Sequence, residues 1–156
     1  MTDHESAKGL PDAIRAGLRS SRSTFQDGAD RGDPAACVKL NLVGSDLGGD
    51  TGPCAAAASW APLARAAGGV LEKVDLQSAK GTSAAVLRAL AAACGGPAGL
   101  LLRVKLNNAK DTTRDGVAAL LDGCPGLEEL DLSTTGIEAL PRAVRTKAEI
   151  PGDMII

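Results

Sequence analysis

The feature that most constrains this chain is a nine-residue pattern that occurs four times. The copies are CVKLNLVGS from Cys37, LEKVDLQSA from Leu71, LLRVKLNNA from Leu101 and LEELDLSTT from Leu127. Each copy places apolar residues at its first, fourth and sixth positions, and such alternation indicates a strand with one buried face. Successive copies start 34, 30 and 26 residues apart, which fits one strand and one helix per repeat. Chance explains one such match, but four in register indicate a repeat architecture.

The intervals between the copies carry helix signals. After the second copy, Thr82 or Ser83 is the candidate N-cap, and after the third copy it is Thr112 or Thr113. The first interval is longer and contains Pro62, so its helix is expected to be short or broken. The expected buried helix faces are Val86, Leu87, Leu90 and Cys94 after the second copy, and Val117, Leu120, Leu121 and Cys124 after the third.

The LxxLxL core of each copy, followed by a helix of variable length, resembles the leucine-rich repeat family. The stretch GVAALLDGCPGLEELDLS is similar to its ribonuclease-inhibitor-like and cysteine-containing classes, in which Gly opens the helix and Cys-Pro leads into the next strand. The resemblance implies an α/β fold, a short right-handed solenoid of about four strand–helix repeats with a parallel sheet on the concave face. The ninth position, where the family commonly buries Asn or Cys, holds Ser45, Ala79, Ala109 and Thr135, so looser ascending loops are expected.

Three segments are expected in the domain organisation. The leucine-rich-repeat domain covers residues 37–145, and residues 1–36 form a polar N-terminus with a cap helix within residues 11–25. Residues 146–156 form a C-terminal tail that either folds back over the last repeat as a cap, which is the favoured alternative, or docks into a neighbouring molecule. The apolar residues available are Ile14, Leu18 and Phe25 in the helix and Met154, Ile155 and Ile156 in the tail.

The overall composition argues against several classes of partner. The net charge is −2, and the aromatic residues are only Phe25 and Trp60, so neither a basic surface nor a stacking platform for nucleic acid is expected. No apolar run approaches the length of a membrane span. The first residues lack the apolar core of a signal peptide. An intracellular, cytoplasmic location is therefore expected, with an organelle left open.

Few residues are available for catalysis or metal binding. The single histidine is His4, so no Ser–His or Cys–His pair is expected. The four cysteines form no CxxC pair and have no histidine nearby, and we therefore expect no catalytic residue, no metal and no cofactor. Three cysteines occupy repeat positions that are buried, whereas Cys54 fits none of them and is expected to be exposed. A reactive thiol at Cys54 is left open.

The third, fifth and seventh positions of each copy are expected on the outer, concave face of the sheet, because side chains alternate across a strand. This face has a basic band, and acidic residues gather at its C-terminal end. Ordinary solvation of a sheet surface explains the pattern as well as a function does. The functional interpretation is that an acidic segment of a partner protein lies across the band. The residues expected to bind the partner are Lys39, Asn41, Lys73, Asp75, Gln77, Arg103, Lys105, Asn107, Glu129 and Asp131.

The resemblance implies a non-enzymatic protein–protein interaction module, working as an adaptor, a scaffold or a subunit of a multi-subunit complex. The alternative is a GTPase-activating regulator of a small GTPase, because some ribonuclease-inhibitor-like repeat proteins accelerate GTP hydrolysis. That activity needs a polar residue presented by a loop, and Arg114, Asn107 and Asn108 are the nearest candidates. Unchanged hydrolysis rates across a panel of small GTPases would remove this alternative.

Overall fold

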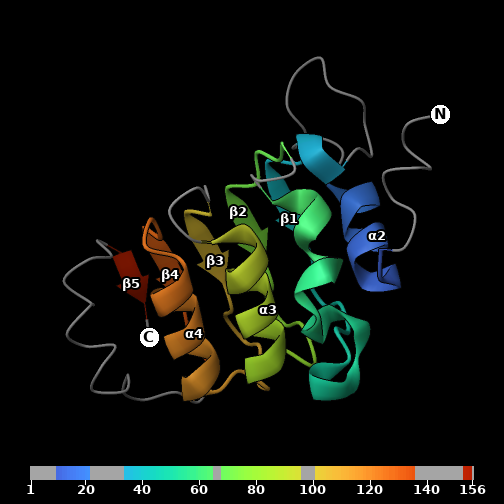
Figure 1. Cartoon of the computed structure of the whole chain (residues 1–156). Helices are drawn as coiled ribbons and strands as arrows, with labels where there is room; N and C mark the ends of the chain where they lie inside the picture. Colours follow the sequence, from blue (N-terminus) through green and yellow to red (C-terminus); the bar gives the residue numbers. More distant parts are fainter. Residues whose placement is uncertain (1–9, 22–33, 65–67, 96–100, 136–152, 156) are drawn as a thin grey trace.

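Each of the four nine-residue copies forms a short strand in the computed structural model of the chain (Figure 1). The structure describes residues 10–21, 34–64, 68–95, 101–135 and 153–155. Neighbouring strands are parallel and follow one another in chain order, with a fifth strand from the C-terminal tail at the end. An α/β fold with a parallel sheet is therefore confirmed. The strands are β1 (Lys39–Asn41), β2 (Lys73–Asp75), β3 (Arg103–Lys105), β4 (Glu129–Asp131) and β5 (Asp153–Ile155).

The apolar positions of the pattern form one continuous core. Every residue at a first, fourth or sixth position is buried, and none exposes more than 3% of its surface. The prediction that these positions are buried is confirmed. The fourth and sixth positions are two residues apart in an extended segment and therefore point to the same face. These residues are Cys37, Leu40, Leu42, Leu71, Val74, Leu76, Leu101, Val104, Leu106, Leu127, Leu130 and Leu132.

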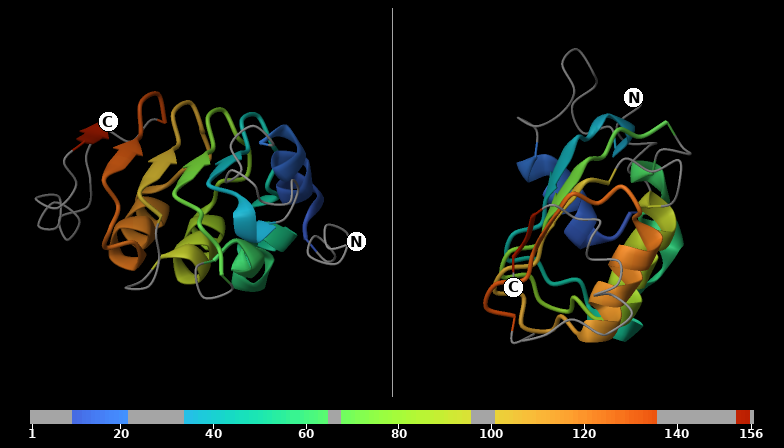
Figure 2. Two further views of the ribbon diagram at one scale, coloured as in Figure 1. Left: turned by 90° about the horizontal axis from the view of Figure 1, so that it is seen from above. Right: turned by 90° about the vertical axis from the view of Figure 1, so that its left-hand side faces the viewer.

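The helices α3 (Ala84–Cys94) and α4 (Arg114–Gly123) pack against each other and cover one face of the sheet (Figure 2). Ser83 caps α3 by accepting a hydrogen bond from the backbone N–H of Val86, and Thr113 caps α4 in the same way. Of each pair of candidate caps, the second residue is therefore the cap. The two predicted apolar helix faces are buried, including Cys94 and Cys124.

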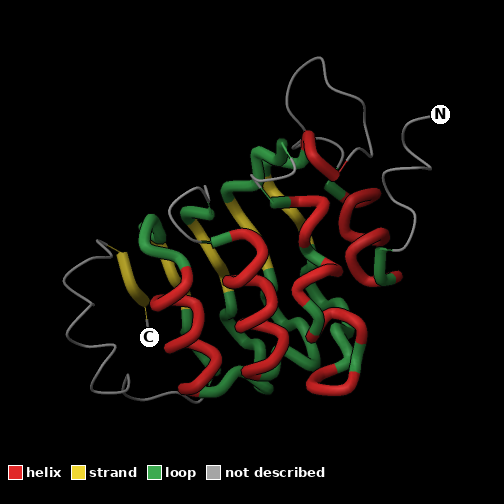
Figure 3. Tube along the Cα trace, in the orientation of Figure 1, coloured by secondary structure: helices red, strands yellow, loops and turns green. Residues whose placement is uncertain are grey.

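The first interval forms four single turns of 3-10 helix rather than an α-helix, as the position of Pro62 predicted. Figure 3 shows them as short helical pieces beside α3. The buried Trp60 ring lies among them, and its Nε1–H donates to the carbonyl oxygen of Cys54 at 2.8 Å. The turns are η3 (Gly49–Thr51), η4 (Pro53–Ala55), η5 (Ala57–Ser59) and η6 (Ala61–Leu63).

The expectation of an exposed Cys54 is wrong. Its side chain is 1% exposed, and burial raises the pKa of its thiol to about 11. The reason is the path of the backbone, since the hydrogen bond from Trp60 closes η4 and η5 around the indole ring and brings Cys54 into the core. A reactive thiol at this position has no support, because the thiolate is the reactive form.

Hydrogen bonds between successive units connect the loops that lead from the strands to the helices. The hydroxyl oxygens of Thr82 and Thr112 lie 3.1 Å apart, and both side chains are buried. The backbone N–H of Gly81 donates to Oδ2 of Asp111 at 2.8 Å. These contacts join adjacent loops without the Asn or Cys that the resemblance placed at the ninth position.

A helix and a strand lie along the two outer strands of the β1–β4 sheet. The helix α2 (Asp12–Ser20) packs beside β1 and buries Ile14 and Leu18. At its end, the hydroxyl oxygen of Ser21 accepts a hydrogen bond from the backbone N–H of Asn41 at 2.7 Å. At the opposite edge β5 pairs with β4. Two outer strands that would otherwise be open to self-association are thus covered. Phe25 and Ile156 lie outside the described residues.

Candidate partner-binding face

The four strands bring the predicted third- and fifth-position residues into one grid. Lys39 pairs with Lys73, Lys73 with Arg103, and Arg103 with Glu129 in the parallel register. The fifth positions pair in the same order. We name this surface the strand face and define it as Lys39, Asn41, Lys73, Asp75, Arg103, Lys105, Glu129 and Asp131.

The strand face points away from the helices. In each strand the central residue is buried, while the two flanking residues are partly or fully exposed. The helices α3 and α4 lie on one side of the sheet (Figure 2). Since the buried central residues face these helices, the flanking side chains project from the opposite side. Within the described part of the chain no helix covers this side.

Lys73 lies at the electrostatic centre of the strand face. Its pKa is lower than the ordinary value of 10.5, first because partial burial desolvates the ammonium group and then because Lys39 and Lys105 repel its charge. Asp75 and Glu129 act in the opposite direction without cancelling this effect. Side chains from four neighbouring strands therefore act on one another here.

Two cations of the strand face, Arg103 and Lys105, have no direct partner among the described residues. Their side chains form no hydrogen bond and no ion pair within the part of the chain that the structure describes. Asp75 is the single acid on β1–β3, and its Oδ1 accepts the backbone N–H of Gln77 at 3.1 Å. Like charges directly opposite each other on neighbouring strands destabilise a sheet. The like-charged neighbours of Lys73 therefore lower the stability of the folded sheet.

The fifth position has a structural role that the sequence analysis did not identify. Oδ1 of Asn41 accepts the N–H of Val43, and Oδ1 of Asp131 accepts the N–H of Ser133, both at 3.0 Å. Asp75 makes the same turn. Asn and Asp favour turns of this kind, so the recurrence of Asn or Asp in this column was a usable signal. Lys105 breaks the column and adds a positive charge there.

The seventh-position residues lie at the ends of the strands. Val43 is the one large apolar side chain exposed among the described residues, at 47%. Gln77, at the same position of the next copy, accepts the N–H of Gly44 with its backbone carbonyl oxygen. The side-chain Oδ1 of Asn107 is buried and has no donor among the described residues. Val43 was not among the predicted binding residues, although an exposed valine beside a basic band offers an apolar contact to a partner.

The candidate residues for a GTPase regulator lie in the turn after β3 and at the start of α4. Arg114 is exposed and begins α4, whereas Asn108 donates a hydrogen bond from its side chain to Oγ of Ser78 at 2.9 Å. Asn108 also has a positive φ of 62°, as do the equivalent Ser78 and Thr134. Its position is thus explained by the turn after β3.

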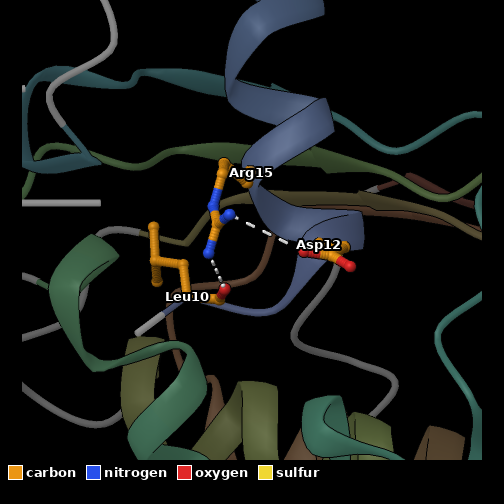
Figure 4. A network of polar contacts seen from close by, with 3 residues as sticks. All are labelled: Leu10, Asp12 and Arg15. Atoms are coloured by element: carbon orange, nitrogen blue, oxygen red, sulfur yellow. Dashed lines mark hydrogen bonds and ion pairs between the residues drawn. The ribbon is translucent and has the colours of Figure 1, made fainter. Parts of the chain in front are cut away.

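A cavity of about 260 Å³ lies between the start of α2 and the chain around Asp46 to Cys54. Asp12 and Asp46 lie at its polar rim, and Cys54 lines it. Asp12 forms an ion pair with Arg15 at 3.7 Å, and Arg15 donates to the carbonyl oxygen of Leu10 at 2.9 Å (Figure 4). These contacts fix the start of α2. Since the thiol pKa is raised, the cavity holds no activated nucleophile.

The remaining cysteines are also buried. Burial raises the pKa of Cys37, Cys94 and Cys124 to about 12 each. His4 lies outside the described residues. In the part of the chain that the structure describes, no group of three or more His, Cys, Asp or Glu side chains is placed to hold a metal ion. None of the described helices is both long and apolar enough to cross a membrane.

No family model, no curated protein and no solved structure matches this chain. The interpretation of the strand face therefore depends on the residues, their register and their charges. The predicted binding residues on β1–β4 are brought together by the register, while Gln77 and Asn107 lie where the strands end.

Proposed function

We propose that the chain is a short right-handed leucine-rich-repeat solenoid with the strand face on its concave side. The buried columns, the parallel strands in chain order and the helices on one side support this proposal. Strands are packed more closely than helices, so a stack of such units curves toward its strands. The described residues at both outer strands, α2 and β5, would then act as caps.

We further propose that the chain is a non-enzymatic protein-binding module, an adaptor or a subunit of a larger assembly. Its strand face would bind an acidic segment of another protein at Lys39, Lys73, Arg103 and Lys105. The observation that carries the proposal is the direct register of Lys39, Lys73 and Arg103 on three successive strands.

The order of charges along the third-position residues supports a binding face over ordinary solvation of a sheet surface. A sheet surface selected only for solubility would alternate charges between strands, because opposite charges across strands stabilise and like charges destabilise. Here three cations follow one another, and repulsion from Lys39 and Lys105 adds to the larger effect of burial in lowering the pKa of Lys73. Local departures from favourable pairing are expected at functional sites.

The experiment is native affinity purification of the full chain at moderate salt. The test variant is Lys39→Glu/Lys73→Glu/Arg103→Glu, and the matched control is Arg19→Glu/Arg88→Glu/Arg114→Glu, which makes the same charge change at exposed helical positions. Circular dichroism first establishes that both variants fold. We expect wild type and control to retain one stoichiometric partner that the test variant loses. Retention of the same partner by all three proteins would reject the strand face as the binding site.

A further inference from the structure

The strand face changes sign between two neighbouring strands. Arg103 on β3 pairs directly with Glu129 on β4, and Lys105 pairs directly with Asp131. On β1–β3 the face has four basic residues and the single acid Asp75, whereas on β4 both positions are acidic. The face is therefore divided into a basic side and an acidic side.

We propose that the strand face selects an extended peptide segment whose charges are segregated, with acidic residues over β1–β3 and a basic residue over β4. This inference rests on the proposed function, because it specifies the partner of the same face. It goes further in requiring a cation in the partner at Glu129 and Asp131, where a uniformly acidic segment meets repulsion.

The strand spacing sets the separation of the two charges in the partner. Adjacent strands lie about 4.8 Å apart, so β2 and β4 are separated by roughly 10 Å. An extended peptide advances about 3.3 Å per residue. Only alternate side chains of an extended segment face the sheet, so a segment with an acidic residue over Lys73 places the basic residue that faces β4 two or four positions away.

The acidic side is fixed in position by the turn that follows β4. Oδ1 of Asp131 accepts hydrogen bonds from both the backbone N–H and the hydroxyl of Ser133. These bonds hold the carboxylate where it is and leave its other oxygen for a ligand. A polyanion such as nucleic acid places negative charge across the whole face and so meets the carboxylates of β4. Charge complementarity thus favours the mixed peptide.

The test compares three synthetic hexapeptides by NMR titration of the isotope-labelled full chain at low salt. One has segregated charge, Glu-Glu-Gly-Ser-Lys-Lys, and one has the same composition interleaved, Glu-Lys-Gly-Ser-Glu-Lys. The third is uniformly acidic, Glu-Glu-Gly-Ser-Glu-Glu. We expect the segregated peptide to bind roughly fivefold more tightly than either of the others, which is the effect of two exposed ion pairs.

The variant Glu129→Lys/Asp131→Lys tests the inference independently, because it makes the β4 part of the strand face basic. It should reverse the preference, so that the uniformly acidic peptide binds most tightly. Equal or tighter binding of the uniformly acidic peptide to the wild type would overturn the inference.

The same titration separates this inference from the proposed function. If the uniformly acidic peptide binds the wild type at least as tightly and Lys39→Glu/Lys73→Glu removes its binding, the strand face remains a binding face and only the charge order is rejected. If no peptide shifts the strand-face amides at millimolar concentration, the inference is rejected, and the affinity purification decides the proposed function.

Discussion

Lys39 and Lys73 lie directly opposite each other in the parallel pair of β1 and β2. The proximity of the two ammonium groups contributes to the lowered pKa of Lys73, after the larger effect of its burial. Strand pairs with opposed like charges are normally avoided because they lose stability. The repulsion within this pair lowers the free energy of unfolding, and the proposed role of the strand face depends on the same charges. Both effects can be measured.

The first prediction is that Lys73→Gln stabilises the protein. A lowered folded-state pKa means that the folded chain binds this proton less tightly than the unfolded chain. At pH values below the folded-state pKa, the charged side chain therefore lowers the free energy of unfolding. This loss of stability disappears as the pH rises past 10.5. At pH 7 we expect a gain of about 0.5 kcal/mol, since partial exposure screens the repulsion. Urea unfolding measures it.

The control for this prediction is Arg88→Gln, a charge removal at an exposed position of α3. It should leave the unfolding free energy unchanged, and the gain from Lys73→Gln should shrink at high salt. A loss of stability in Lys73→Gln at low salt would contradict the account of the repulsion.

The second prediction concerns the buried hydroxyl pair of Thr82 and Thr112. Thr112→Val removes one partner and leaves the buried hydroxyl of Thr82 unpaired, which should cost about 1–2 kcal/mol. The double variant with Thr82→Val should cost little more than the single one, because both polar groups are then gone. A double-mutant cycle by chemical unfolding gives the coupling. Additive losses would show that the two hydroxyls do not depend on each other.

The third prediction is a loss of stability at alkaline pH from the buried thiols. The folded-state pKa is about 12 for Cys37, Cys94 and Cys124 and about 11 for Cys54, against an ordinary value of 9.0. Above pH 9 the unfolded thiols ionise while the folded ones stay protonated, so the free energy of unfolding should fall. Each thiol contributes up to about 1.4 kcal/mol per pH unit.

Urea unfolding between pH 8 and pH 10 checks this slope. The matched variant is Cys54→Ala, which removes one ionising thiol and should make the fall shallower. Lys73 acts in the opposite direction below pH 10.5, but it is a single group. Stability that is constant between pH 8 and pH 10 would contradict the burial of the thiols.

The periodic part of the fold was predictable from the spacing of the apolar residues in the repeated pattern. Leucine at fixed spacing predicted both the buried columns and the register, because one strand residue in two faces the core. Each helix cap was predicted as one of two adjacent hydroxyl residues, and the structure selects Ser83 and Thr113. The proximity of Lys39, Lys73 and Arg103 followed from the same alignment, so this part of the candidate site was predictable too.

The irregular parts were not predictable, because their positions depend on distant contacts. The burial of Cys54 is set by the hydrogen bond from Trp60 within the 3-10 turns. The bond from Asn41 to Ser21 joins segments that are far apart in the chain. The positive φ at Gly44 and Asn108 is an exception, because a Gly and an Asn at this position of the pattern were a signal for it.

The fourth prediction concerns the pairing of β5 with β4. Deletion of residues 153–156 exposes the backbone of β4 along its whole length, so we expect a lower melting temperature and concentration-dependent self-association. The conservative variant Met154→Val retains the backbone pairing and should remain monomeric. Light scattering after size-exclusion chromatography checks both. An unchanged melting temperature and mass for the truncated chain would show that β5 does not protect this edge.

The most direct test of the strand face as a binding face is the titration of the Lys73 side chain by NMR, with and without the segregated peptide. In the free protein its pKa should lie below 10.5. Binding should raise this pKa, because a peptide carboxylate then offsets the repulsion from Lys39 and Lys105. A Lys73 pKa that stays the same while the peptide is bound would place the ligand elsewhere and contradict the account.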